Sequence, residues 1–188
     1  MCTVSFTARL VDKPTIQQRT SWLNYKDQKV SIVELERANR NDMRAFSDAS
    51  SAWMKNGGRY AGSMLDIAIQ GNYRSNLHKN HYYALTTQTG GFDKLSADKI
   101  LGLMLFYENA DPANEIGLLE VNPSTSRSNN FLRKYKQVGK KLVEYVQSEY
   151  PQKDIAVWSD YSARKFYRKM GFVNKSKDVC DLCWRAVK

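Results

Sequence analysis

The fold is decided by a strand, a loop and a helix in the middle of the chain, which carry Ile116-Gly-Leu-Leu-Glu-Val121, Pro123 and Lys134-Tyr-Lys-Gln-Val-Gly-Lys-Lys-Leu142. The first stretch is apolar on both faces, which is typical of a central strand in a sheet. Pro123 ends it, and the spacing predicts a helix over 138–149. The N–H groups that begin a helix lack partners and carry its positive dipole end. This segment therefore predicts an anion site suited to a pyrophosphate.

Glycine and basic residues surround the start of this predicted helix. Gly139 leaves room for a ligand to approach the backbone closely. The stretch from 127 to 141 holds six cations and no acidic residue: Arg127, Arg133, Lys134, Lys136, Lys140 and Lys141. A solvated basic helix face is the alternative interpretation. The segment is neither a Walker P-loop, which needs Gly-Lys-Ser/Thr, nor a GxGxxG turn.

The flanking sequence predicts an alternating set of strands and helices. Apolar alternation predicts strands over 29–36, 81–87, 99–107 and 154–158. Helical spacing predicts helices from Asn41-Asp42, as the cap, to Lys55, over 60–69 and over 161–170, and residues 179–187 are expected to add one or two strands. This order predicts an α/β chain of the α+β type, with a mixed sheet and helices on its faces. We divide it into an N-terminal extension, 1–28, and one domain, 29–188.

The composition indicates which kinds of partner and which cell compartment to expect, and says little about the fold. The 188 residues include 29 Lys and Arg against 19 Asp and Glu, a net charge of +10 that favours polyanions such as nucleic acid, phosphorylated cofactors or acidic membranes. No stretch approaches the roughly 20 apolar residues that span a bilayer. The N-terminus lacks the pattern of a signal peptide. Three cysteines argue against a disulfide scaffold. We therefore expect a cytoplasmic protein without a membrane partner.

A second chemical signal lies nearer the C-terminus and has the sequence Asp160-Tyr-Ser-Ala163-Arg-Lys-Phe166-Tyr167-Arg-Lys-Met-Gly171-Phe172. Four residues share one face of a short helix: Ala163, Phe166, Tyr167 and Met170. Gly171 suits the left-handed position that ends a helix. Core packing is the plainer interpretation of this face taken alone.

Together, the two signals resemble the GNAT superfamily of acyl-CoA-dependent N-acetyltransferases. Its members carry a Val-x-Pro-like step and a Gln/Arg-x-x-Gly-x-Gly/Ala turn that opens a helix. One strand later they carry an Asn-x-x-Ala-x-x-Phe-Tyr-x-x-x-Gly-Phe helix. The resemblance covers roughly residues 101–172. It implies the GNAT fold, a mixed and mostly antiparallel central sheet splayed at the cofactor, with helices on both faces. It also implies an enzyme that uses acetyl-CoA as cosubstrate.

The resemblance also implies where the cofactor would be bound. The backbone at Val121 would pair with the pantetheine arm, and amides from about Gln137 to Lys140 would cradle the pyrophosphate. The implied cofactor-binding residues are Val121, Lys134, Lys136, Gln137, Val138, Gly139, Lys140, Asp160 and Tyr167. Three of these positions depart from the family pattern, because Lys134 replaces its Arg or Gln, Gln137 its first glycine, and Asp160 its asparagine. The stretch between Pro123 and Lys134 is longer than in the family.

The same resemblance implies the catalytic residues. Tyr167 takes the position of a tyrosine that protonates the leaving CoA thiolate, a role that suits a phenol with a pKa of about 10. The group that takes the proton of the amine is left open between Glu115, Glu120 and a water chain. Strand alternation places the two glutamates on opposite faces unless a bulge intervenes. Either glutamate could instead be a plain surface or ion-paired residue.

Metal binding is not expected. Four residues are of zinc-ligand type: His78, His81, Cys180 and Cys183. The two cysteines are expected on a terminal strand, where a spacing of three puts their side chains on opposite faces. We therefore interpret all four as core or surface residues.

The sequence as a whole predicts an N-acetyltransferase that moves acetyl from acetyl-CoA to a primary amine by direct attack. No cysteine has the context of a nucleophile. The acceptor stays open among aminoacyl-tRNA, a protein lysine or N-terminus, and a small amine. RNA is a candidate partner of the basic surface, and a homodimer, common in the family, is a candidate assembly. The alternative is a non-catalytic GNAT-fold module that binds CoA or nucleic acid.

Overall fold

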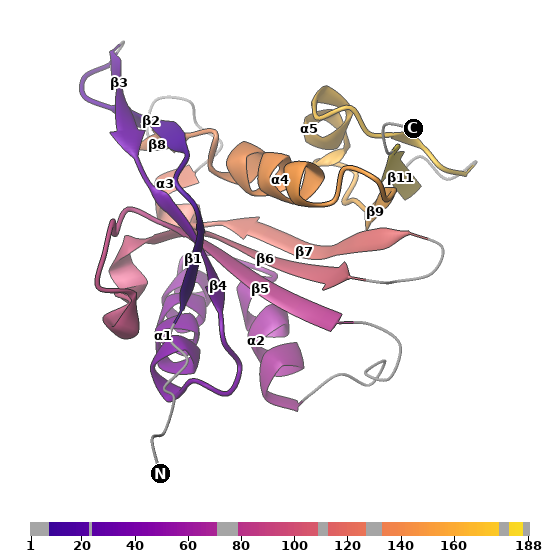
Figure 1. Ribbon diagram of the computed structural model, residues 1–188. Helices are drawn as coiled ribbons and strands as arrows, with labels where there is room; N and C mark the ends of the chain where they lie inside the picture. The colour runs from indigo at the N-terminus through magenta and orange to yellow at the C-terminus, as the bar shows by residue number, and fades with distance from the viewer. Residues whose placement is uncertain are drawn as a thin grey trace.

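A twisted sheet of eight strands separates two helical layers in the computed structural model (Figure 1). The structure describes residues 8–22, 24–70, 79–108, 113–126, 133–176 and 181–185. In spatial order, the strands are β1 (Arg9–Asp12), β4 (Ser31–Leu35), β5 (Lys79–Thr86), β6 (Ile100–Glu108), β7 (Asn114–Val121), β9 (Ile155–Trp158), β11 (Asp181–Trp184) and β10 (Val173–Asn174). All neighbouring pairs are antiparallel except β7 and β9, which are parallel. The predicted mixed, mostly antiparallel sheet is confirmed.

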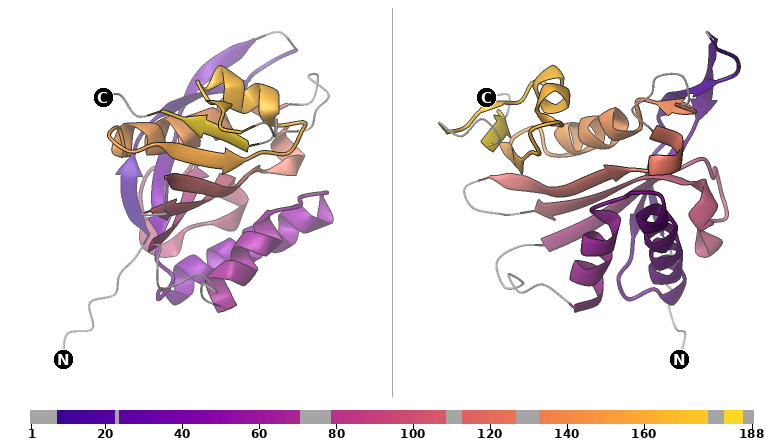
Figure 2. Two further views of the ribbon diagram at one scale, coloured as in Figure 1. Left: turned by 90° about the vertical axis from the view of Figure 1, so that its right-hand side faces the viewer. Right: turned by 180° about the vertical axis from the view of Figure 1, so that it is seen from behind.

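Helices cover both faces of this sheet, as predicted. On one side lie α1 (Arg40–Lys55) and α2 (Ala61–Gln70), and on the other lie α4 (Val138–Glu149) and α5 (Arg164–Lys169) (Figures 1 and 2). Three short pieces complete the helical part: α3 (Pro123–Ser126), η1 (Phe92–Lys94) and η2 (Ala97–Lys99). No helix among the described residues is long and apolar enough to cross a bilayer.

Strand β6 supplies both hydrophobic cores by alternation. Leu103 and Leu105 point to the layer of α1 and α2, whereas Met104 and Phe106 point to the layer of α4. All four side chains are almost fully buried. Burying a side chain of this size stabilises the fold by roughly 1.5–3 kcal/mol. The central strands are therefore the rigid base on which the polar loops at their ends are held.

The first helix begins earlier than the sequence predicts. Asn39 is its N-cap, because its side chain accepts from the backbone N–H groups of Asn41 and Asp42. The expected cap at Asn41-Asp42 is therefore wrong. Asp42 is buried instead and accepts from the N–H of Ala8 at 3.2 Å and of Glu36 at 2.9 Å. Its carboxylate ties the chain before β1 to the end of β4.

A bulge interrupts β7. Leu118 pairs with Leu105 and Ile116 with Phe106, so the residue between them, Gly117, has no counterpart on β6. A side chain there would collide with the neighbouring ring, because an added Cβ would lie 2.4 Å from Tyr107 Cε2. A bulge reverses the alternation beyond it. Two side chains on opposite sides of Gly117 can therefore share a sheet face where simple alternation would place them on opposite faces.

The N-terminal segment forms strands that the sequence does not predict. β1 pairs with β4 at the edge of the large sheet. β2 (Thr15–Arg19) and β3 (Tyr25–Lys29) form a hairpin, and β2 also pairs with β8 (Tyr135–Lys136), just before α4. The segment that we named an N-terminal extension, 1–28, thus contains β1, β2 and most of β3. The hairpin projects above the body of the molecule (Figure 1).

Candidate active site

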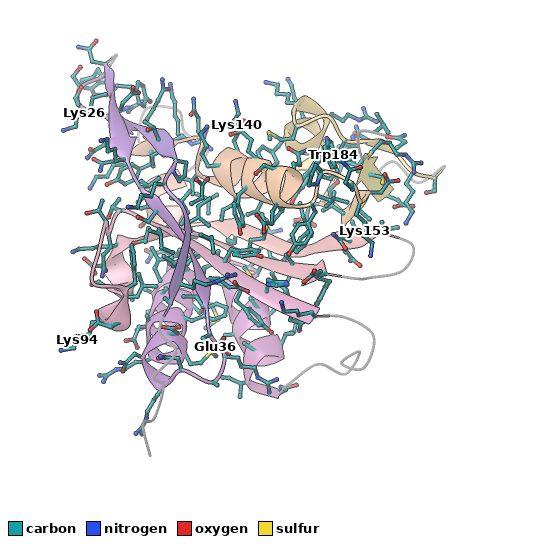
Figure 3. All side chains as sticks on the ribbon, viewed as in Figure 1. Lys26, Glu36, Lys94, Lys140, Lys153 and Trp184 are labelled. Atoms are coloured by element: carbon teal, nitrogen blue, oxygen red, sulfur yellow. The ribbon has the colours of Figure 1, made fainter. Side chains whose placement is uncertain are left out.

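A pocket of about 570 Å³ lies where β7 ends and α4 begins, with α5 along its side. One wall is apolar and consists of Leu119, Val121, Ala163, Phe166 and Tyr167. The other wall holds Tyr135, the start of α4 at Gln137, Val138 and Gly139, and four cations, which are Arg133, Lys136, Lys140 and Lys169. Lys140 lies at the α4 start on the side away from the sheet (Figure 3). The pocket thus combines an apolar channel with an anion-binding end.

The structure brings most of the predicted cofactor residues to this pocket. Seven line it: Val121, Lys136, Gln137, Val138, Gly139, Lys140 and Tyr167. Lys134 and Asp160 are not among its lining residues. Lys134 instead joins neighbouring segments, because its carbonyl accepts from Arg19 N–H and its N–H donates to the Thr125 carbonyl.

Gln137 has the backbone conformation of a glycine. Its φ is 72° and ψ is 6°, and it is the one residue other than glycine with positive φ in the described part of the chain. It occupies the position where the family motif carries its first glycine. The departure in sequence therefore leaves the left-handed turn in place, at a cost of order 1 kcal/mol or more for a residue with a side chain.

The turn at Gln137 exposes the first amides of α4 to the pocket. Among the described residues, no side chain caps this helix and no acidic residue lies in its first turn. Gly139 faces the apolar wall: an added Cβ would lie 3.4 Å from Val121 Cγ2 and 3.6 Å from Phe166 Cζ. A side chain longer than a methyl group at this position would therefore occupy the pocket itself.

Arg133 is a pocket residue that the sequence placed beside the predicted anion site but that is not among the implied cofactor-binding residues. Its Nε is buried and has no hydrogen-bond partner among the described residues. Leaving such a donor unpaired costs about 1–3 kcal/mol, more when it is charged. An anionic group in the pocket would relieve this cost. The basic run of 133–141 is a sufficient sequence signal that Arg133 lies at the pocket. Phe166, Ala163 and Leu119 could be assigned to the pocket only from the faces of α5 and β7 that they share.

Tyr167 lies at the base of the pocket and is 5% exposed. Its ring packs edge-on against Phe166 and Phe172, with centroid distances of 5.0 and 5.4 Å. Burial raises the pKa of its hydroxyl well above the ordinary value, and the nearby Tyr60 and Asp160 raise it further. The phenol is thus protonated at neutral pH and able to donate a proton.

The two candidate bases lie on one face of the sheet. Glu120 pairs with Leu103 and Glu115 with Tyr107, and both partners point toward α1 and α2. The bulge at Gly117 thus overturns the simple expectation of opposite faces. Neither glutamate lines the pocket.

The surroundings of Glu120 are those of a helix cap. Its carboxylate accepts from the backbone N–H groups of Arg59 at 2.7 Å, Tyr60 at 3.1 Å and Ala61 at 2.7 Å. These groups begin α2, where the helix dipole also favours a negative charge. Glu120 therefore fixes the start of α2 against the end of β7, and three donors already use its lone pairs.

Asp160 lies in the loop between β9 and α5. Its carbonyl accepts from the N–H of Ala163 at 2.9 Å and of Arg164 at 3.1 Å. Its exposed carboxylate accepts a hydrogen bond from the Tyr60 hydroxyl. That bond, together with partial burial, raises the pKa of Tyr60 to about 12.

The zinc-type residues do not come together in the described part of the chain. His78 and Cys180 lie outside the described residues. The ring nitrogens of His81 contact carboxylates, with Nδ1 2.5 Å from Glu34 Oε1 and Nε2 2.8 Å from Glu108 Oε2. No three His, Cys, Asp or Glu side chains within the described ranges are grouped to hold a metal ion.

Comparison with known proteins finds likeness in fold only. No protein-family model matches the sequence, and no curated protein matches it. The structure of Tetrahymena GCN5 is 11% identical at a TM-score of 0.47, covering 77% of this chain and 80% of that chain. AtaT complexed with acetyl-methionyl-tRNAfMet is 13% identical at a TM-score of 0.46, covering 82% and 94%. The mixed, mostly antiparallel sheet with helices on both faces agrees with the GNAT fold that the resemblance implies.

Proposed function

We propose that this chain is an N-acetyltransferase that moves acetyl from acetyl-CoA to a primary amine by direct attack. The observation that carries the proposal is the pocket between β7, α4 and α5. It offers uncapped amides and cations at one end, an apolar channel along Val121 and a buried, protonated Tyr167. The phosphorylated end, the extended pantetheine arm and the thioester of acetyl-CoA need these three environments, in that order.

The residues of the pocket have separate tasks in this proposal. The amides from Gln137 to Lys140 bind the pyrophosphate, and the unpaired Arg133 Nε supplies a further donor to an anionic oxygen. The backbone at Val121 holds the pantetheine arm. Tyr167 protonates the sulfur as the C–S bond breaks. Holding amine and thioester together supplies most of the remaining rate enhancement.

Calorimetry with acetyl-CoA tests the proposal directly. We expect micromolar binding to the wild-type protein and none to Gly139→Glu, because the new side chain occupies the pocket. Gly90→Glu is the matched control, since it adds the same charge where an added Cβ meets nothing within 4 Å. Absence of binding in the wild type, or equal binding in all three proteins, would overturn the proposal.

The acceptor is any of the three amine classes that the sequence leaves open, and a cytoplasmic location is part of the proposal. Acetylation of an aminoacyl-tRNA by this basic protein should fall steeply with salt, because phosphate contacts release counterions. A flat salt profile, with turnover of a small amine, would exclude an RNA carrier. The same titration decides whether the basic face serves the acceptor or only the phosphates of CoA.

A further inference from the structure

A hydrogen bond joins two distant parts of the chain near the end of β7. Tyr60, the residue before α2, donates its hydroxyl to the carboxylate of Asp160, 100 residues later in the loop after β9. The backbone N–H of Tyr60 is held by Glu120, one residue before the pocket residue Val121. Asp160 is therefore tied to the place where the parallel strands β7 and β9 end.

Among the described residues, Asp160 is an acidic group without a cationic partner, although the protein is strongly basic. The ion pairs of the described residues use other carboxylates: Asp48, Glu34, Glu108, Glu144 and Asp154. No described lysine or arginine is paired with Asp160. Besides Asp160, the charges that act on its partner Tyr60 are those of Arg59 and Glu120. An exposed carboxylate in this setting attracts a cation from solution.

Asp160 lies near Tyr167, so a cation bound to its carboxylate would lie near the proposed proton donor. Both Tyr60 and Asp160 lie close enough to raise the pKa of the Tyr167 hydroxyl, after the larger effect of burial. Trp158, at the end of β9, is 65% exposed. It points toward the side of α1 and α2, because its neighbour Val157 is buried under α4. An exposed indole face suits an alkylammonium group.

The other acidic residues are less well placed. Three backbone donors already use the carboxylate of Glu120. Glu115 pairs with Ala156 near the beginning of β9, whereas Asp160 follows the end of that strand. Asp160 is the carboxylate that is both exposed and close to Tyr167.

We propose that Asp160 binds the ammonium form of the acceptor amine and takes the proton that the amine must lose before it attacks. The Tyr60 hydroxyl occupies this carboxylate when no acceptor is present. This inference rests on the proposed function and names the acceptor subsite of the same reaction.

The protons balance in this scheme. The ammonium gives one proton to Asp160, which passes it to solvent through its exposed side. The free amine forms the C–N bond, and the C–S bond breaks with its electron pair on sulfur. Tyr167 gives its proton to that sulfur. The second proton that nitrogen loses, as the amide forms, restores the phenol.

Asp160→Asn removes the negative charge of residue 160 and keeps its hydrogen bond to Tyr60, because the amide oxygen still accepts from the Tyr60 hydroxyl. Calorimetry and initial rates use n-pentylamine as the probe, with CoA or acetyl-CoA at saturation and pH 7.5. We expect Asp160→Asn to weaken n-pentylamine binding about tenfold and to lower kcat/KM roughly 10²-fold. Hydroxylamine, a nucleophile that is uncharged at this pH, should react with both proteins at rates within about threefold.

Two further variants distinguish the effect of the Asp160 charge from the effect of its hydrogen bond to Tyr60. Tyr60→Phe leaves Asp160 intact, so n-pentylamine should bind as tightly or a few-fold more tightly. Asp48→Asn removes an exposed carboxylate on α1 and should change neither reaction. A loss in Tyr60→Phe equal to that in Asp160→Asn would show that the bond only supports the loop, and would overturn the inference.

The remaining outcomes are equally decisive. Equal losses with n-pentylamine and hydroxylamine in Asp160→Asn, no effect of this variant, or no binding of n-pentylamine by the wild type would each overturn the Asp160 assignment. In all three cases acetyl-CoA binding by the wild type would leave the proposed function in place. Failure to bind acetyl-CoA would instead remove the proposed function.

Discussion

Glu34 and His81 join two neighbouring strands, with Glu34 Oε1 2.5 Å from His81 Nδ1 across β4 and β5. The second oxygen of Glu34 lies 2.5 Å from Arg9 Nη2 on β1, and the second ring nitrogen of His81 lies 2.8 Å from Glu108 on β6. Since both partners of the ring are carboxylates, both ring nitrogens can donate when His81 carries its proton. Four adjacent strands thus share one row of contacting acidic, basic and imidazole side chains, which we call the charge row.

This row predicts loss of stability in acid. Burial alone would raise the pKa of Glu34, but hydrogen bonds from His81 and Arg9 outweigh it and lower the pKa to about 2. A carboxyl with a depressed folded pKa stabilises the fold above its unfolded pKa of 4.5, and this contribution disappears as pH falls from about 4.5 to about 2. After allowance for solvent screening, we expect about 1–2 kcal/mol.

Urea unfolding of the wild type and Glu34→Gln between pH 6 and pH 2.5 measures this contribution. The stability difference between the two proteins should be largest at pH 6 and shrink through the acid range. A difference that stays constant with pH would contradict the charge row. Asp48→Asn, on the exposed face of α1, is the control.

Replacement of Gln137 by glycine should preserve or improve the protein. A glycine adopts φ near 72° without strain, so the free energy of unfolding should rise by up to about 1 kcal/mol. Acetyl-CoA affinity should stay the same, because the backbone amide remains. Gln137→Val should lower stability, because a β-branched residue tolerates this conformation poorly. Thermal unfolding that ranks valine at or above glycine would contradict the conformational argument.

Arg133→Met should separate stability from binding. The variant removes a buried donor that has no partner, so the free protein should be as stable as the wild type or more stable. Affinity for acetyl-CoA should fall at least about tenfold, as expected for a charge-assisted contact to phosphate. Calorimetry and urea unfolding on one preparation check both. Arg44→Met, an exposed change on α1, should affect neither.

Tyr167→Phe should abolish turnover without loss of the cofactor. The phenylalanine ring keeps the edge-on contacts to Phe166 and Phe172, so stability and acetyl-CoA affinity should hold. Loss of a proton donor should lower kcat roughly 10²–10⁴-fold. A measurable kcat that does not change would mean that the tyrosine only packs. A kcat near zero in both proteins would favour the non-catalytic alternative.

Glu120→Gln distinguishes a helix cap from a base. The amide oxygen can still accept from the start of α2, so we expect a stability loss of about 1 kcal/mol and less than a tenfold change in kcat. A fall of roughly 10²-fold or more in kcat, with stability unchanged, would return Glu120 to the role of base. Unfolding and initial rates are measured side by side.

Local signals in the sequence were sufficient for the elements around the pocket. The predicted helix over 138–149 matches α4 at both ends, because Gln137 and Gly139 mark its start and Pro151 follows its end. Strands β5, β6 and β9 were predicted within about two residues, since their apolar patterns are continuous. Helix α5 is shorter than the predicted 161–170, because residues 160–163 form a turn before it.

The features that the sequence missed depend on contacts between distant residues. β2 and β3 carry polar side chains on both faces, with Ile16 the one buried residue among them, so no alternation marks them as strands. The bulge at Gly117 is a property of the pair β6 and β7 together. Likewise, the bond between Tyr60 and Asp160 links positions that share no local pattern. The contact between Tyr60 and Asp160 was therefore less predictable than the residues that line the pocket.

The pairing of β2 with β8 makes the anion-binding turn depend on residues far ahead of it in the chain. Gln17 and Gln18 hold Lys136 and Tyr135 in register, directly before Gln137. Ile16 fills the core beneath them. A fragment that begins at Val30 would retain every residue that lines the pocket, and would still lose the strand that orders its entrance. Truncation at that point removes a strand that supports the candidate pocket rather than a dispensable segment.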